Sequence, residues 1–130
     1  MAHRLNSAAW DRLLEKAQVE VSRILRALPS HLRNTAQSVT LAYEGSPSNA
    51  LIKDGIEPDT LGLFVGDAFA DAEQSASPIP PQIILYLENL WDLAEHDDEI
   101  FLDEVRATYL HELGHYLGLE EDELTDRGLE

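Results

Sequence analysis

The segment that decides the fold is DEIFLDEVRATYLHELGHYL, residues 98–117. Its apolar side chains recur at helical steps of three, four and seven residues, and the four that define one face are Leu102, Tyr109, Leu113 and Tyr116. Acidic residues at Asp97 and Asp98 suit the positive end of a helix. The segment therefore predicts a helix that begins near these two residues and runs to about Leu117.

Upstream of this helix, the sequence predicts one further helix and three strands. Residues 7–28 have an amphipathic period, with Ser7 as the expected N-cap and Pro29 as the stop. The strands are expected at 38–44, 61–66 and 82–87, and the turn-rich segment 67–81 is expected to be a loop. This order predicts an α+β fold that has, along the chain, an N-terminal helix, a three- to four-stranded mixed sheet and a C-terminal helix.

Length and composition narrow the class of protein. A chain of 130 residues allows one domain, which we expect to span residues 1–130. The absence of cysteine excludes disulfides, thiolate metal sites and cysteine nucleophiles. The formal net charge of −16 argues against a nucleic-acid partner, and all of the excess negative charge falls in residues 61–130. With neither a signal peptide nor a long apolar run in view, we expect a cytoplasmic protein with no membrane partner.

Within the last predicted helix lies HELGH, residues 111–115, which has the H-E-x-x-H pattern. Residues four apart lie one turn apart on the same face of a helix, so the imidazoles of His111 and His115 can bind one ion. Glu112 follows by one residue, from where its carboxylate can reach a water on that ion as a general base. The pattern predicts a Zn²⁺ site with His111 and His115 as ligands and Glu112 as the catalytic residue.

A third ligand is expected just after the helix. Gly118 can end the helix in a left-handed conformation and turn the chain back, and Glu121 then follows His115 by six residues. This spacing matches the H-E-x-x-H-x-x-G-x-x-(H/D/E) arrangement of metzincin-like sites. The spacing of this motif favours Glu121 as the third ligand, although Glu120, Asp122 and Glu123 also carry carboxylates.

The sequence resembles the small bacterial zincin-like metallopeptidases, sometimes called minimal zincins. The resemblance rests on LGLFVG (61–66), PPQIILY (80–86) and EVRATYLHELGHYLGLEEDEL (104–124). It implies a zincin core in which the H-E-x-x-H helix packs under a small sheet, and it implies the same roles for the two histidines and Glu112. Family members commonly have Asp-Asp where this chain has Glu120-Glu121, so the resemblance leaves open which carboxylate binds.

Two functions fit these residues. The first is a zinc-dependent peptidase whose peptide or protein substrate pairs with an exposed edge strand around Leu63–Val65. The second is a non-catalytic zinc-binding domain that acts as an interaction module. A peptidase also needs a group that stabilises the oxyanion. The sequence offers four candidates for it without choosing between them, namely Tyr86, His96, Tyr109 and Tyr116.

Overall fold

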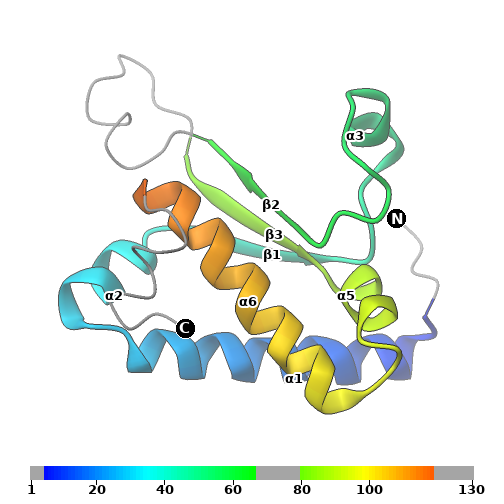
Figure 1. The fold of residues 1–130 in the computed structure, drawn as a ribbon, viewed down its shortest axis with the longest axis horizontal. Coiled ribbons are helices and arrows are strands. Elements are labelled where there is room, and N and C mark those ends of the chain that lie inside the picture. Colours follow the sequence, from blue (N-terminus) through cyan, green and yellow to red (C-terminus); the bar gives the residue numbers. More distant parts are fainter. Residues whose placement is uncertain (1–4, 67–79, 119–130) are drawn as a thin grey trace.

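The computed structural model describes residues 5–66 and 80–118. These residues form five helices and three strands (Figure 1). In chain order the elements are α1 (Ser7–Ala27), α2 (Ser30–Ala36), β1 (Thr40–Glu44), α3 (Asn49–Lys53), β2 (Gly62–Val65), β3 (Gln82–Tyr86), α5 (Leu87–Leu93) and α6 (Asp98–Leu117). The predicted α+β class is confirmed, and so are the two long helices and the three strands.

The three strands form one mixed sheet in the order β1-β3-β2. The central strand β3 pairs in parallel with β1, where Leu41 lies opposite Ile83, and antiparallel with β2, where Phe64 lies opposite Ile83. The central place suits β3 because its sequence is almost entirely apolar and four of its five residues are buried. In the part of the chain that the structure describes, β2 therefore lies at an edge of the sheet.

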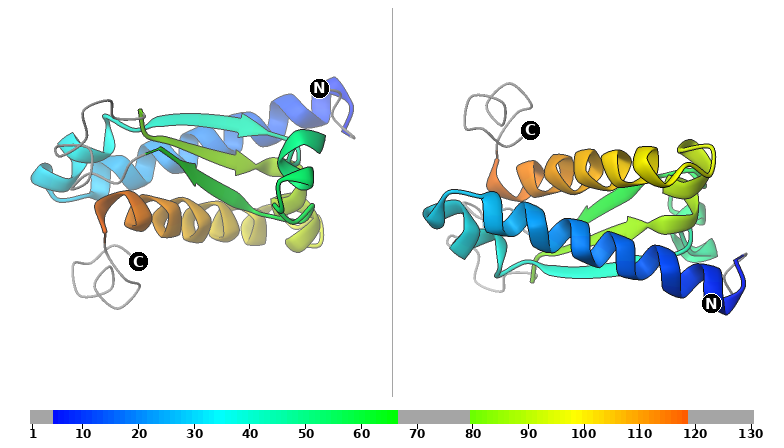
Figure 2. Two further views of the ribbon diagram at one scale, coloured as in Figure 1. Left: turned by 90° about the horizontal axis from the view of Figure 1, so that it is seen from above. Right: turned by 90° about the horizontal axis from the view of Figure 1, so that it is seen from below.

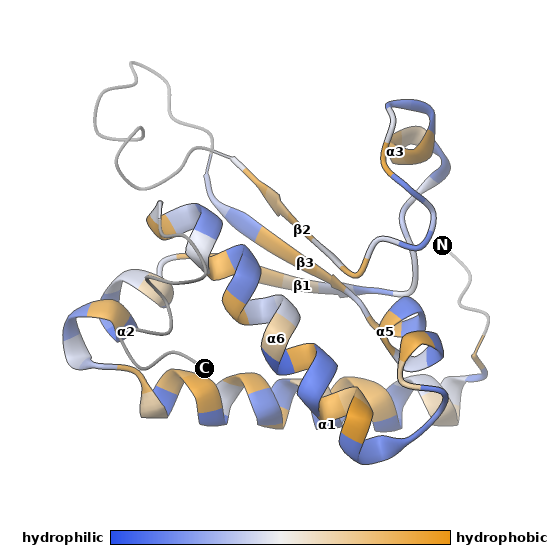
Figure 3. Cartoon of the chain, in the orientation of Figure 1, coloured by the Kyte–Doolittle hydropathy of each residue, from blue (hydrophilic) through white to orange (hydrophobic). Residues whose placement is uncertain are grey.

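The two long helices lie side by side against one face of the sheet and run in the same direction (Figure 2). An ion pair between Arg12 and Asp98, 2.7 Å long, joins the second turn of α1 to the first turn of α6. Figure 3 shows apolar and polar residues interspersed along both helices. In α1 the apolar residues recur on one side, as amphipathic packing requires. The buried cluster between helices and sheet includes Leu13, Ala17, Val21 and Ile24 of α1, Ile83 and Leu85 of β3, and Phe101, Val105, Tyr109 and Leu113 of α6.

The ends of the long helices follow from their capping residues. The predicted N-cap of α1 at Ser7 is wrong: the cap is Asn6, whose Oδ1 accepts a 2.8 Å hydrogen bond from the backbone N–H of Ala9. In α6 the Asp97 side chain caps the N-terminus by accepting from the N–H of Ile100. Gly118 ends α6 with a φ of 72°, a left-handed conformation that glycine adopts without steric strain.

The remaining differences from the sequence prediction are local. The first strand begins at Thr40 rather than at residue 38, and the short helices α2, α3 and α5 were not predicted. Most of the expected loop at 67–81 lies outside the described residues. None of the helices described is both long and apolar enough to span a membrane.

Candidate metal centre

His111 and His115 lie one turn apart on the side of α6 that faces away from the core. Their ring centroids are 4.6 Å apart, and both residues are exposed. The side chains of Tyr109, Leu113 and Tyr116 are buried on the opposite side of the helix. This division matches the two faces expected from the sequence, since the core holds the helix while the imidazoles stay accessible to an ion.

Glu112 is the buried member of this group. Its residue is only 7% exposed, and its Oε1 lies 3.3 Å from Nδ1 of His115. One potential ligand atom from each of the three side chains lies within 4.8 Å of the others. Imidazole nitrogens are donors that zinc accepts, and a carboxylate lies beside them, so the residues present fit the ion that the sequence predicts.

The strand β2 lies unusually close to α6 beside Glu112, and a glycine makes this possible. A Cβ atom at Gly62 would lie 2.5 Å from Cγ2 of Thr108 and 3.4 Å from Cγ of Glu112. Any larger residue at this position would push the strand away from the helix. Neither Gly62 nor Thr108 was predicted from the sequence as a site residue; the available signal was a glycine inside a strand, which marks a close approach of another backbone or side chain.

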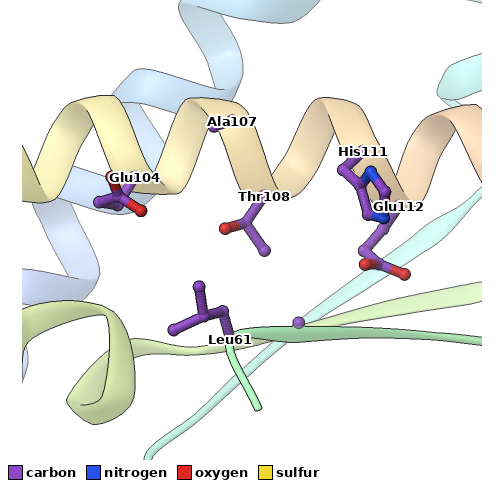
Figure 4. A pocket seen from close by; sticks show the side chains of 7 residues that line it. Leu61, Glu104, Ala107, Thr108, His111 and Glu112 are labelled. Carbon is purple, nitrogen blue, oxygen red and sulfur yellow. The ribbon is translucent and has the colours of Figure 1, made fainter. Parts of the chain in front are cut away.

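A groove of about 380 Å³ runs along α6 from the candidate metal centre toward the start of the helix (Figure 4). It is lined by Leu61, Gly62, Glu104, Ala107, Thr108, His111 and Glu112. Figure 4 shows the side chains of Thr108 and Glu112 pointing from the helix toward the strand, with Leu61 across from them. The centre therefore opens into a groove bounded by a helix on one side and an edge strand on the other.

The tyrosines proposed as oxyanion groups are held elsewhere. Tyr109 is buried in the core, and burial raises its pKa to about 12, with a smaller contribution from Tyr43. Tyr116 packs its ring 5.9 Å from that of Phe64, and its hydroxyl lies 3.3 Å from Oγ of Ser38. The hydroxyl of Tyr86 is buried with no hydrogen-bond partner among the described residues, and burial raises its pKa. None of the three lines the groove.

The histidine proposed for the same role is also engaged away from the groove. His96 stacks on Trp91 with ring centroids 5.1 Å apart, and its Nε2 lies 3.2 Å from Oδ1 of Asp92. The expected third ligand, Glu121, lies outside the described residues together with Glu120, Asp122 and Glu123, so that assignment stays a prediction.

A family model for zincin-like metallopeptidases matches residues 36–129. The chain belongs to the zincin-like metallopeptidase family. The match takes in the whole sheet and the helix α6 of this zincin-like chain, whereas α1 precedes it. No curated protein matches the sequence. Membership implies a metal, and the His111–Glu112–His115 group is the candidate for holding it.

Proposed function

We propose that this protein is a zinc-dependent peptidase. The observation that carries the proposal is the group formed by His111, Glu112 and His115, which stands at one end of a groove open to a substrate. In this proposal the two imidazoles hold the ion, and Glu121 supplies a third ligand from the segment after α6. With three protein ligands, zinc keeps a fourth position for water, as catalytic zinc sites do.

Glu112 is proposed as the general base. Zinc, when bound, supplies Lewis acidity that polarises a carbonyl and lowers the pKa of water toward neutrality. The Glu112 carboxylate is positioned to accept the proton, because it lies beside the imidazole of His115 on the groove side of the helix. Its burial keeps bulk water from competing for the same oxygen atoms and fixes their direction.

The proposed substrate is an extended peptide or protein segment that binds along β2. The strand pairs with β3 on one side, and its residue Val65 is 39% exposed. Backbone N–H and C=O groups on a free strand edge can pair with an added strand. Val65→Pro is expected to weaken peptide binding while zinc content stays unchanged; equal binding by both proteins would contradict this placement.

We further propose that the protein acts in the cytoplasm and does not bind nucleic acid.

The proposal is tested with wild type, Glu112→Ala and the control Asp103→Asn, whose side chain is exposed on the same helix and does not line the groove. Each protein is purified without chelators, its zinc content is measured, and it is assayed against a mixed peptide library. We expect about one zinc per chain in all three and cleavage by wild type and Asp103→Asn only, since loss of a general base lowers the rate about 10²- to 10⁴-fold. Wild-type protein that takes up no added zinc would refute the proposal.

A second candidate function is a non-catalytic zinc-binding domain that binds peptides. It is favoured by the position of Tyr86, His96, Tyr109 and Tyr116, none of which lines the groove where an oxyanion would form. In the experiment above, it predicts that wild type and Glu112→Ala both hold zinc and that neither cleaves any peptide.

A further inference from the structure

We propose that Glu104 binds a basic side chain of the substrate, so that the protein prefers peptides with Lys or Arg near the bond to be cleaved. The inference rests on the proposed function, because it assumes that the groove holds a peptide. Glu104 is the carboxylate that lines the groove away from the candidate metal centre, at the opposite end from Glu112 (Figure 4).

The position of Glu104 follows from the geometry of α6. It precedes His111 by seven residues, or nearly two helical turns, which brings both side chains to the same side of the helix. A rise of about 1.5 Å per residue puts them about 10 Å apart along the axis. An extended peptide advances about 3.3 Å per residue, so this separation corresponds to about three substrate residues.

The lining between the two ends suits a long basic side chain. Leu61, Ala107 and the methyl group of Thr108 offer apolar surface, over which the methylene groups of Lys or Arg can lie. The Glu104 carboxylate then stands where the cationic end of such a side chain would arrive. An uncharged side chain of equal length would make the apolar contacts and leave the carboxylate without a partner.

The carboxylate of Glu104 is available for this contact. Over residues 5–66 and 80–118, it forms no hydrogen bond or ion pair with another side chain, although the residue is half-buried. Its neighbour Asp103 is exposed and does not line the groove. The surrounding charge also favours a cation, because the chain carries a net charge of −16.

The test compares matched peptides that carry Lys, norleucine or Glu at each of three positions on either side of one bond. For wild type, we expect kcat/KM about fivefold higher with Lys than with norleucine at one of these positions, as for a partly exposed ion pair. Glu104→Gln should abolish this preference mainly through KM, and Glu104→Lys should reverse it in favour of Glu. The control Asp103→Asn should keep the wild-type preference.

A measurement of peptide binding tests this inference separately from the proposed peptidase activity. Fluorescein-labelled versions of the same peptides are titrated by anisotropy against zinc-loaded Glu112→Gln, with and without the additional change Glu104→Gln. Preferential binding of the Lys peptide that depends on Glu104 supports the inference even if no peptide is cleaved. Equal affinity for the Lys and norleucine peptides, or an equal loss of preference in Asp103→Asn, overturns it whether or not the protein is a peptidase.

Discussion

The two long helices each bury one glutamate, and the two glutamates have different surroundings. Glu20 of α1 is 4% exposed, and both of its carboxylate oxygens accept hydrogen bonds from Nη2 of Arg23, at 2.7 and 2.8 Å. Glu112 of α6 is 7% exposed, and the basic group beside it is the imidazole of His115, at 3.3 Å. One carboxylate is neutralised by a permanent cation of its own helix, while the other lies next to an imidazole.

This difference indicates which buried glutamate serves stability and which serves function. A buried carboxylate costs free energy unless it is paired, and Arg23 offsets that cost for Glu20 within a single turn of helix. Glu112 lacks a guanidinium or ammonium partner among the described residues, and it lies beside two imidazoles that fit a metal ion. We therefore interpret Glu20 as a group that contributes to packing and Glu112 as a group retained for chemistry.

The largest expected effect concerns the two sides of α6. It tests whether stability depends on the side chains that face the core and not on the histidines that face away from it. Leu113 is fully buried, whereas its near neighbour His111 is exposed. We expect Leu113→Ala to lower the free energy of unfolding of the metal-free protein by about 3 kcal/mol, through lost burial and the cavity left behind. His111→Ala should change it by less than about 0.5 kcal/mol. Urea unfolding measures both, and similar values for the two variants would show that the faces are not separate.

The next effect concerns the approach of β2 to α6. Gly62→Ala should lower the free energy of unfolding by about 2 kcal/mol, because the new Cβ would overlap Cγ2 of Thr108. Thr108→Ser removes that methyl group, so the double variant should recover most of the loss. A double-mutant cycle by urea unfolding measures the coupling. Additive effects of the two changes would mean that the strand moves away from the helix without strain.

The features of the fold and of the candidate site that could be predicted from the sequence are those whose determining residues lie close together in the chain. The bounds of α6 were predictable because Asp97, the apolar period and Gly118 all lie in one segment, and the spacing of His111 and His115 sets their geometry on a helix. The short helix α2 was not predicted, because seven residues are too few for a stable isolated helix and its stability comes from burying Leu32 and Ala36. Likewise, the contact between Gly62 and Thr108 joins residues 46 positions apart, and only the fold brings them together.

A smaller effect concerns Tyr109, on the core side of α6, and the dependence of protein stability on pH. Burial raises the pKa of Tyr109 to about 12 from its ordinary value of 10.0, so the folded protein keeps the phenolic proton when the unfolded chain has lost it. This stabilisation of the neutral form is fully present below pH 10 and is lost as the pH rises toward 12. At pH 11 the folded protein has lost about 1 kcal/mol of this stabilisation. Tyr109→Phe should therefore lose less stability than wild type between pH 9 and pH 11 in urea unfolding, and equal losses would contradict the assignment.

The smallest effect addresses the two glutamates directly. Replacing each by Gln preserves shape and removes the charge, so any difference between the variants reports what the charge does in the folded protein. Glu20→Gln should lower the free energy of unfolding by somewhat less than about 1 kcal/mol, because the bond to Arg23 is charge-assisted but the guanidinium side chain is 66% exposed. Glu112→Gln should leave the metal-free protein equally stable or slightly more stable, because it removes a buried carboxylate that has no such cation beside it. Both variants are measured by urea unfolding after chelation, with Arg23→Gln as a check that the loss at position 20 belongs to the ion pair. If Glu112→Gln destabilised the protein as much as Glu20→Gln, Glu112 would contribute to packing as Glu20 does, and the contrast between the two helices would disappear.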